Sequence, residues 1–158
     1  MKVVIQRVKK ASVSVNQKDV GSIKRGYLLL VGFDQGDRPD LLSPMLNKIC
    51  QLKLFPDDQG RFAHSIIEVS GELLIVSQFT LSAELKKGKK PSFTRAMDPV
   101  EAESLYTRFV DLSRQTGIST QTGIFGELMQ VSLQNDGPVT ILMDSRELFP
   151  SLYQPGSG

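Results

Sequence analysis

Residues 71–81, GELLIVSQFTL, decide the fold of this chain. Leu73 to Val76 follow one another without a polar break, which is typical of a strand with both faces buried. Tyr27 to Phe33 form a similar apolar run between Gly26 and the turn-rich residues 34–39. We therefore predict two central strands, at 71–79 and 27–33.

Shorter patterns supply the rest of the predicted sheet. Alternation of apolar and polar residues predicts strands at 3–8 and 12–15 near the start of the chain. Three more β segments are predicted at 118–122, 128–133 and 139–144. Residues 55–60, FPDDQG, are typical of a turn.

Residues 41–52 change to helical spacing, with apolar residues at 41, 42, 45, 46, 49 and 52. This pattern predicts a helix of about three turns. Ser43 can serve as its N-cap with Pro44 as the first helical residue, or the helix can begin earlier, at Pro39.

A second helix is predicted from Pro99, because Asp98 is a good N-cap and Glu101 stands three residues after it. Gly117 ends this helix. The order of elements indicates an α+β fold: a curved, barrel-like, mostly antiparallel sheet with two main helices packed outside. We expect a single domain at 1–145, followed by a partly mobile C-terminal tail at 146–158.

The composition limits the possible functions. The chain has 158 residues, one Cys, one His and a net charge of +2. One cysteine cannot form an internal disulfide, and one Cys with one His cannot build a Cys/His zinc site. His64 is the only imidazole for a Ser-His-Asp or Cys-His pair. The sequence shows no signal peptide and no apolar run near 20 residues, so we expect a cytoplasmic protein without membrane association.

The charges are unevenly distributed along the chain. Residues 1–25 and 86–95 together hold 12 basic residues and one acidic residue, a balance of +11, whereas the remainder has a balance of −9. Two such windows on one face suit a polyanion, although each can also be a solvated loop. We expect both windows to flank the strand end at 77–81.

Three segments are candidates for a functional role and not only a structural one: SQFTL at 77–81, KGKKPSF at 87–93 and NDGPVT at 135–140. The first places hydroxyl and amide groups at a strand end, where they can converge on a carbonyl. Ser and Thr also satisfy local backbone groups at such ends. The third restricts the backbone around Gly137 and Pro138 and permits a cis peptide, although the same residues form ordinary turns.

Taken together, these segments give a resemblance to the D-aminoacyl-tRNA deacylases, which remove D-amino acids from mischarged tRNA. It is carried, in chain order, by VVIQRVKKASV at 3–13, SQFTL, KGKKPSF, TGIFG at 122–126 and MQVSLQNDGPVT at 129–140. The resemblance extends from Met1 to Asp144.

The resemblance implies a homodimer with a pocket shared between subunits. The catalytic segment of one subunit lines the pocket, and a Gly-cisPro motif of the other enters it. An L-amino acid then meets rigid backbone, a D-amino acid directs its side chain outward, and glycine is accepted, including glycine mischarged on tRNA-Ala. The residues implied are Ser77, Gln78, Phe79 and Thr80 for catalysis, and Gly137 and Pro138 for chiral selection.

The implied reaction is hydrolysis of the ester bond of D-aminoacyl-tRNA, which releases the D-amino acid and tRNA without a metal or an organic cofactor. Thr80 is a candidate nucleophile, but the SQFTL segment contains no His or Lys to activate it. We expect instead that Thr80, Phe79 and backbone N–H groups hold the carbonyl while the RNA 2′-hydroxyl activates a water.

The resemblance gives further residues a role. Arg7 is assigned to the Gly-Pro turn and Met129 to the pocket; without the resemblance, Arg7 is a surface charge on an edge strand and Met129 a core residue. The lysines assigned to the phosphates of the acceptor stem are Lys86, Lys87, Lys89 and Lys90.

Three residues stand outside these assignments. Ser82 departs from the family, in which many members have an aromatic residue after SQFTL, and we expect it to affect one peripheral contact. His64 is predicted in a loop, and Cys50 is predicted in the core. Two other functions stay open: a tRNA-binding module without activity, and a related deacylase of L-aminoacyl-tRNA.

Overall fold

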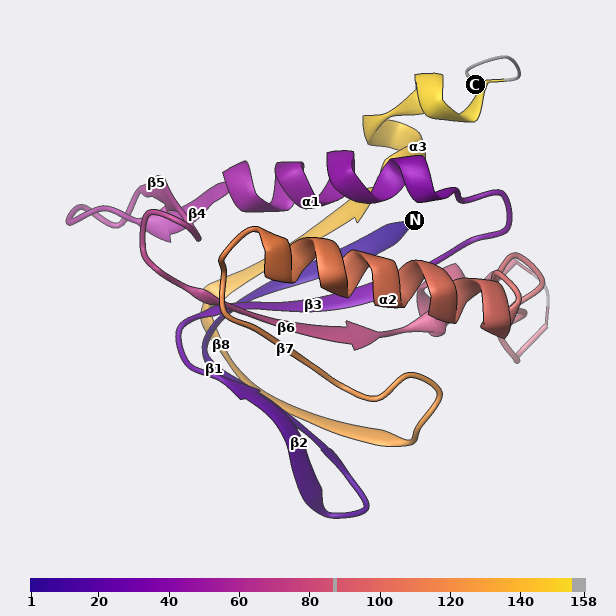
Figure 1. Cartoon of the computed structure of the whole chain (residues 1–158), viewed down its shortest axis with the longest axis horizontal. Coiled ribbons are helices and arrows are strands. Elements are labelled where there is room, and N and C mark those ends of the chain that lie inside the picture. The colour runs from indigo at the N-terminus through magenta and orange to yellow at the C-terminus, as the bar shows by residue number, and fades with distance from the viewer. Residues whose placement is uncertain (87, 155–158) are drawn as a thin grey trace.

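A six-stranded mixed sheet forms the body of the molecule (Figure 1). The computed structural model describes residues 1–86 and 88–154; Lys87 and residues 155–158 lie outside the described residues. The strands of this sheet are β1 (Lys2–Val15), β2 (Lys18–Ile23), β3 (Gly26–Gly32), β6 (Glu72–Ser77), β7 (Thr120–Thr122) and β8 (Met129–Asp144).

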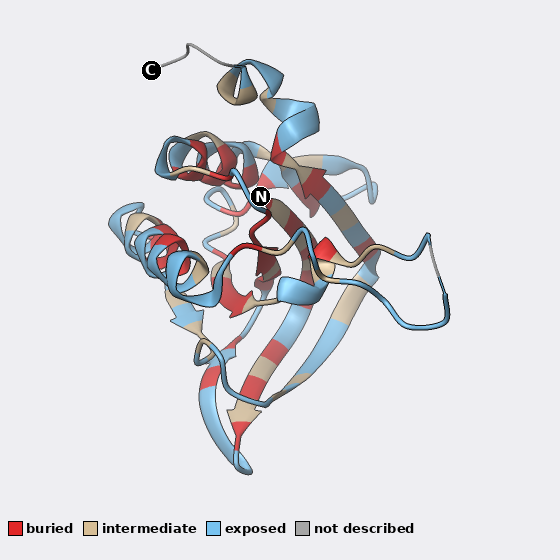
Figure 2. Ribbon diagram, turned by 90° about the vertical axis from the view of Figure 1, so that its right-hand side faces the viewer, coloured by how far each residue is buried: buried red, intermediate tan, exposed pale blue. Residues whose placement is uncertain are grey.

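The sheet confirms the predicted fold class. β1 pairs antiparallel with β2, β3 and β8, whereas β6 pairs parallel with β3 and β7. The two predicted central strands are β3 and β6, whose apolar residues are buried apart from the half-buried Leu30. Both main helices, α1 (Leu42–Gln51) and α2 (Pro99–Gln115), cover the same side of the sheet (Figure 2).

The N-terminal prediction of two short strands is wrong, because residues 2–15 form one continuous strand, β1. β1 bends strongly at its middle: its first part runs beside β3, and its last part continues down to the hairpin with β2 (Figure 1). Its first half pairs with β3 and its second half with β2, while β8 follows it along most of its length. This long strand is what makes the sheet barrel-like.

The separate strands predicted at 128–133 and 139–144 are likewise one strand, β8. The residues predicted as a turn form a bulge inside it. Gln6 pairs with Thr140 and Val8 pairs with Asn135, so two steps along β1 match five along β8. Residues 136–139 therefore stand out of the regular ladder opposite Arg7.

The start of α2 is as predicted, whereas Ser43 does not cap α1. The Asp98 carboxylate accepts a hydrogen bond from the Val100 N–H, and Pro99 follows at the first helical position, as predicted. Ser43 is not the N-cap of α1. The chain enters α1 through a 3-10 turn, η1 (Pro39–Leu41), so the alternative start at Pro39 is the correct one.

A second, two-stranded sheet is formed by β4 (Lys53–Pro56) and β5 (Phe62–Ser65). The predicted turn at 55–60 is therefore shorter, because Phe55 and Pro56 belong to β4. His64 lies exposed on β5 and not in a loop. The Asp57 carboxylate holds the turn by accepting from the N–H groups of Gln59 and Arg61.

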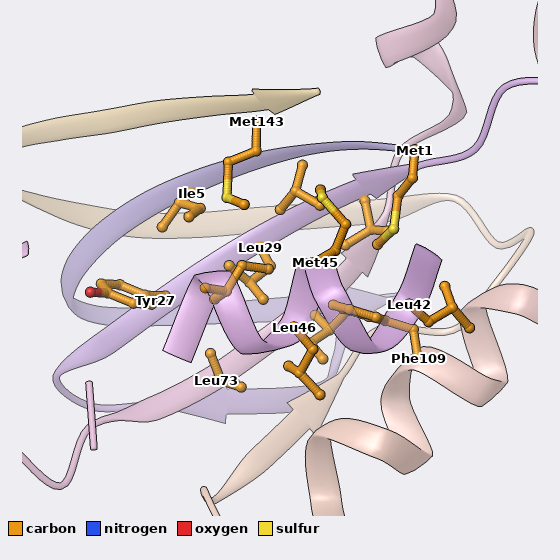
Figure 3. Packing of buried hydrophobic residues seen from close by; sticks show 14 of the residues in the cluster. Met1, Ile5, Tyr27, Leu29, Leu42, Met45, Leu46, Leu73, Phe109 and Met143 are labelled. Carbon is orange, nitrogen blue, oxygen red and sulfur yellow. The ribbon is translucent and has the colours of Figure 1, made fainter. Parts of the chain in front are cut away.

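Two apolar clusters stabilise the sheet from its two faces. The larger lies between the sheet and both helices and includes Ile5, Tyr27, Leu29 and Phe109 (Figure 3). The predicted core residue Cys50 belongs to it. The smaller lies on the other face, where β1 and β2 curl over β3 and β6, and its members include Val13, Leu28, Leu74 and Val76.

The C-terminal segment packs on the helix side of the sheet. α3 (Ser145–Leu148) and η3 (Pro150–Tyr153) follow β8 directly. The Tyr153 hydroxyl donates to Asp37 Oδ1 at 2.7 Å, and Arg38 Nη2 donates to the Leu152 carbonyl at 2.5 Å. Within the described residues, none of the helices has the length and apolar character needed to cross a bilayer.

Candidate active site

A cleft opens where β6 ends. Ser77 is the last residue of β6, Gln78 follows it, and Phe79 begins the 3-10 helix η2 (Phe79–Ser82). These three residues and Met129 of β8 line a cleft with a volume of about 950 Å³. Residues from β6, η2, α2 and β8 thus meet at one end of the sheet.

Thr80 stands beside this cleft and is exposed. Its Oγ1 accepts a hydrogen bond from Gln78 Nε2. An amide N–H is a donor and cannot take a proton from the hydroxyl. Gln78 therefore orients Thr80 without activating it as a nucleophile.

Two aromatic residues that the sequence did not single out, Phe93 and Phe125, line the cleft together with Phe79. Phe79 is 61% exposed and meets Phe93 edge-on, with ring centroids 5.1 Å apart. Phe125 lines the cleft and packs against Tyr106 of α2. Phe93 and Phe125 both lie inside segments quoted above, KGKKPSF and TGIFG, so the motifs contained the signal. Met129 combines its two predicted roles, since it lines the cleft and packs on the smaller apolar cluster.

Gly137 and Pro138 lie exposed on the β8 bulge, joined by a cis peptide bond. Arg7 is not a surface charge on an edge strand: it is 6% exposed, and β1 is paired on both sides. Its Nε donates to the Asp136 carbonyl at 2.8 Å, and its Nη1 donates to the Leu54 carbonyl. Gly137 has a φ of +139°, and a Cβ there would lie 2.9 Å from Arg7 Nη2, so the position requires glycine.

Within one chain, the bulge and the cleft lie at opposite ends of the sheet. Arg7 pairs with Tyr27, Tyr27 with Leu73, and Ser77 lies four residues further along β6. At about 3.3 Å per residue, this is roughly 13 Å along the strand direction. One chain therefore does not bring Gly137 and Pro138 to Ser77.

The basic residues are only partly gathered at the cleft. Lys2 Nζ donates to the Leu81 carbonyl at 3.3 Å, on η2. Lys24 and Arg25 lie at the other end of β6, where the Lys24 N–H donates to Glu72 at 2.6 Å. The expectation that both basic windows flank the SQFTL strand end is therefore wrong for Lys24 and Arg25, because they lie between β2 and β3, beside the first residue of β6.

The loop after η2 carries the predicted tRNA-binding lysines. Lys86, Lys89 and Lys90 are exposed, and Lys87 lies outside the described residues. Glu84 and Ser92 exchange two backbone hydrogen bonds, of 2.8 and 3.0 Å, that close the loop. Phe93 at its base touches Phe79, so the lysine loop (described residues 83–86 and 88–95) is attached to the cleft.

Ser82 is not the peripheral residue that its departure from the family suggested. It is 1% exposed, and its hydroxyl donates to the buried carboxylate of Asp34. Lys2 and Arg95 also contact Asp34, at 3.1 and 3.3 Å. Burial alone raises the pKa of Asp34, but the Ser82 hydrogen bond and the Lys2 ammonium outweigh it, so the pKa lies below its usual value.

The single histidine and the single cysteine do not line the cleft. His64 is on β5, and its sheet partner is Phe55. Burial raises the pKa of the Cys50 thiol on α1, which keeps it protonated. Across residues 1–86 and 88–154, no three His, Cys, Asp or Glu side chains gather closely enough to hold a metal ion.

Comparison with known proteins gives a consistent set of relatives. The family described as D-Tyr-tRNA(Tyr) deacylase matches residues 4–144. A D-aminoacyl-tRNA deacylase of Aquifex aeolicus is 47% identical over 148 residues, which is 94% of this chain and all of that protein. A D-aminoacyl-tRNA deacylase of Herpetosiphon aurantiacus is 47% identical over the full length of both chains.

Two solved structures share the fold. The c-Myc DNA unwinding element binding protein superposes with a TM-score of 0.86 at 41% identity, covering 92% of this chain and 99% of its own. A probable eukaryotic D-amino acid tRNA deacylase superposes with a TM-score of 0.80 at 19% identity, covering 90% and 98%. The second similarity concerns the fold alone.

Proposed function

Because this chain belongs to the family of D-Tyr-tRNA(Tyr) deacylases, we propose that its cleft binds the 3′ end of a D-aminoacyl-tRNA and hydrolyses the ester bond to the terminal adenosine. Water adds to the ester carbonyl carbon, and the bond from that carbon to the ribose oxygen breaks. The products are a free D-amino acid and a tRNA with a restored ribose hydroxyl. The proposed place of action is the cytoplasm, where aminoacyl-tRNAs are used.

Binding and positioning supply most of the catalysis in this proposal. Phe79 and Thr80 begin η2, and the first N–H groups of a helical turn have no acceptor within it. They are donors for the ester carbonyl as negative charge develops on its oxygen. The Gln78 amide donates to the Thr80 hydroxyl and cannot accept its proton, so Thr80 is not activated as a nucleophile. In this proposal the neighbouring 2′-hydroxyl of the RNA activates the water instead.

Chiral selection requires a second copy of the chain. Gly137 and Pro138 are exposed and lie roughly 13 Å along the strand direction from Ser77 in one chain. A partner that brings its own bulge to this cleft presents rigid backbone to the substrate α-carbon. An L side chain collides with that backbone, a D side chain points away, and glycine passes, which makes glycyl-tRNA on tRNA-Ala a second substrate.

An apolar row between the cleft and the bulge is suited to this dimer. Leu142 is 68% exposed on the sheet face opposite the helices, and it pairs with Val4, which pairs with Leu30. A two-fold axis near this row places each bulge at the partner's cleft, because the row lies between them. Exposed apolar side chains of this kind are typical of protein interfaces.

The lysine loop supplies the RNA contact in this proposal. Lys86, Lys89 and Lys90 face solvent on a loop whose Phe93 touches the cleft residue Phe79. Lysine contacts with phosphates position an RNA without reading its bases, which suits an enzyme that acts on many tRNAs. Lys87 belongs to the same motif.

The observation that carries the proposal is the placement of Ser77, Gln78, Phe79 and Met129 on one cleft in a member of this family. The test is hydrolysis by the purified protein of D-Tyr-tRNA, L-Tyr-tRNA and Gly-tRNA, each followed by release of the labelled amino acid. We expect rapid release from D-Tyr-tRNA and Gly-tRNA and background release from L-Tyr-tRNA.

The same assay separates the other functions. Binding of tRNA without release from any substrate would identify an inactive tRNA-binding module. Preferential release from L-Tyr-tRNA would identify the related L-specific deacylase. Either result contradicts the proposal.

A further inference from the structure

The carboxylate of Asp34 joins three segments that are distant in the sequence. It is 2% exposed and lies just after β3. Ser82 of η2 donates to one of its oxygens, and Lys2 of β1 and Arg95 of the lysine loop contact the other, at 3.1 and 3.3 Å. Because Asp34 is buried, its carboxylate cannot touch the substrate and acts through these neighbours.

Each of the three neighbours fixes a part of the proposed site. Ser82 is the last residue of the 3-10 helix that starts with Phe79 and Thr80. Lys2 also donates to the Leu81 carbonyl in the middle of that helix, at 3.3 Å. Arg95 closes the lysine loop, and its carbonyl accepts from the Gln35 N–H at 2.8 Å, directly beside Asp34.

The base of the lysine loop is also tied to β3 by backbone bonds. Asp34 and Ala96 form a bridge, and the Met97 N–H donates to the Phe33 carbonyl at 3.0 Å. Gln35 Nε2 donates to the Thr94 carbonyl at 2.8 Å. The loop therefore has a fixed base, and Asp34 connects this base to η2 in addition to the ring contact between Phe79 and Phe93.

We propose that Asp34 is a positioning residue that holds the ester-binding segment, Phe79 and Thr80, in fixed register with the lysine loop that grips the RNA. The inference rests on the proposed function of the cleft. A fixed distance between the phosphate contacts and the carbonyl site delivers the ester to its donors at the moment the RNA binds. Loss of the Asp34 contacts leaves η2 and the lysine loop folded, but no longer held in fixed positions relative to each other.

The experiment removes one connection at a time. Ser82→Ala removes the bond from η2 to Asp34, and Arg95→Met removes the bond from the loop. The matched controls are Ser104→Ala and Arg114→Met, on the outer face of α2, where Arg114 forms an ion pair with the exposed Asp111, at 3.7 Å. Single-turnover hydrolysis of D-Tyr-tRNA, the Kd for uncharged tRNA and urea unfolding are measured for each variant.

We expect Ser82→Ala and Arg95→Met to lower the single-turnover rate about tenfold, with the Kd of Ser82→Ala within about twofold of the wild type. Arg95→Lys keeps a cation at Asp34 and restores most of the rate. The controls stay at the wild-type rate. The double variant falls by less than the product of the two single effects, because both act through Asp34.

A second measurement does not depend on activity. The Leu81 and Ala83 N–H groups bond to the Gln78 and Thr80 carbonyls within η2. Hydrogen exchange at these amides is expected to accelerate in Arg95→Met and to stay unchanged in Arg114→Met, although Arg95 is not part of η2. Unchanged exchange in η2 overturns the inference even if the wild type proves inactive.

The outcomes separate this inference from the proposed function. A folded wild type that releases no amino acid overturns the proposed function, and the exchange measurement still decides the role of Asp34. An active wild type whose Ser82→Ala and Arg95→Met variants keep its rate overturns only the positioning role.

Discussion

At the scale of single residues, Arg7 shows how one side chain organises a distant segment. Its guanidinium donates to the Asp136 carbonyl on β8 and to the Leu54 carbonyl on β4. The planar group can satisfy both acceptors at once, which a lysine cannot do with the same geometry. Arg7 therefore holds the bulge that carries Gly137 and Pro138.

Replacing Arg7 with Met is expected to lower the free energy of unfolding by about 3 kcal/mol, because two carbonyls lose a charged donor in a buried site. It also releases the bulge, so hydrolysis of D-Tyr-tRNA falls. Urea unfolding and the release assay measure both effects. Arg25→Met is the control, since Arg25 lies exposed over Phe55 at 4.9 Å; an equal loss there would contradict the special role of Arg7.

The Thr80 hydroxyl is expected to be dispensable for bond cleavage. Thr80→Ala keeps hydrolysis within about threefold of the wild type, whereas a substrate with a 2′-deoxy terminal adenosine loses about 100-fold, the usual contribution of general base catalysis. Single-turnover rates with both substrates check this. A large loss in Thr80→Ala with little loss for the deoxy substrate would make Thr80 the nucleophile.

The lowered pKa of Asp34 predicts how the free energy of unfolding changes in acid. The Ser82 hydrogen bond and the Lys2 ammonium hold the pKa of Asp34 in the folded state below the ordinary value of an aspartate carboxyl, so the folded state binds this proton more weakly than the unfolded state. The stabilisation is complete above that value and is lost as the pH falls through the folded pKa. The stability difference between wild type and Asp34→Asn, from urea unfolding, should be constant near pH 6 and shrink below about pH 4.

The control for this acid dependence is Asp111→Asn, an exposed carboxylate on α2 with a side chain 58% exposed. Its difference from wild type should stay small across the same range. A difference for Asp34→Asn that grows as the solution becomes more acidic has the opposite sign and would contradict the assignment.

At the scale of elements, β8 carries the bulge with Gly137 and Pro138, and the C-terminal segment after β8 packs on the helix side of the sheet. β8 is one strand in which a bulge replaces the predicted turn, so the chain carries Gly137 and Pro138 outward without reversing direction. After β8, η3 returns to the helix side. There the Tyr153 hydroxyl bonds to Asp37 and Ser145, and burial raises the pKa of that hydroxyl.

Tyr153→Phe is expected to lower the free energy of unfolding by about 1–2 kcal/mol, because it removes one hydroxyl that bonds to two buried partners. The ring stays against Arg146, whose guanidinium lies 4.4 Å from the ring centroid. Urea unfolding should show a lower midpoint and an unchanged slope. Glu147→Gln on exposed α3 is the control, and equal stability of both variants would show that η3 contributes little.

At the scale of the whole molecule, the proposed function brings the bulge of a second copy to the cleft. Both parts are exposed, and they lie at opposite ends of the β3–β6 pair. The apolar row that contains Leu142 lies between them. The proposed two-fold arrangement would cover this row, in which Leu142 is exposed in the single chain.

Leu142→Lys is expected to convert the protein from dimer to monomer at micromolar concentration and to reduce hydrolysis of D-Tyr-tRNA at least tenfold, because a charge replaces an apolar contact on the axis. Light scattering and the release assay follow the two effects. Leu148→Lys on α3, 39% exposed on the helix side, is the control. A fully active monomer would contradict the shared site.

Several parts of this protein follow from local sequence patterns alone. The apolar runs gave β3 and β6, the Asp98-Pro99 cap gave the start of α2, and the quoted motifs gave the family and the cleft residues Ser77, Gln78 and Phe79. Such features are set by neighbours within a few residues, so periodicity and capping chemistry reveal them.

Which residues from distant parts of the sequence lie close together depends on the tertiary structure. The register of β1 against β3 and β8 placed the bulge away from the cleft, and the parallel pairing of β3 with β6 placed Lys24 and Arg25 at the far end. It also gathered Ser82, Lys2 and Arg95 on Asp34. No local pattern encodes these contacts, because a strand register is fixed by the packing of the whole sheet and its two apolar clusters.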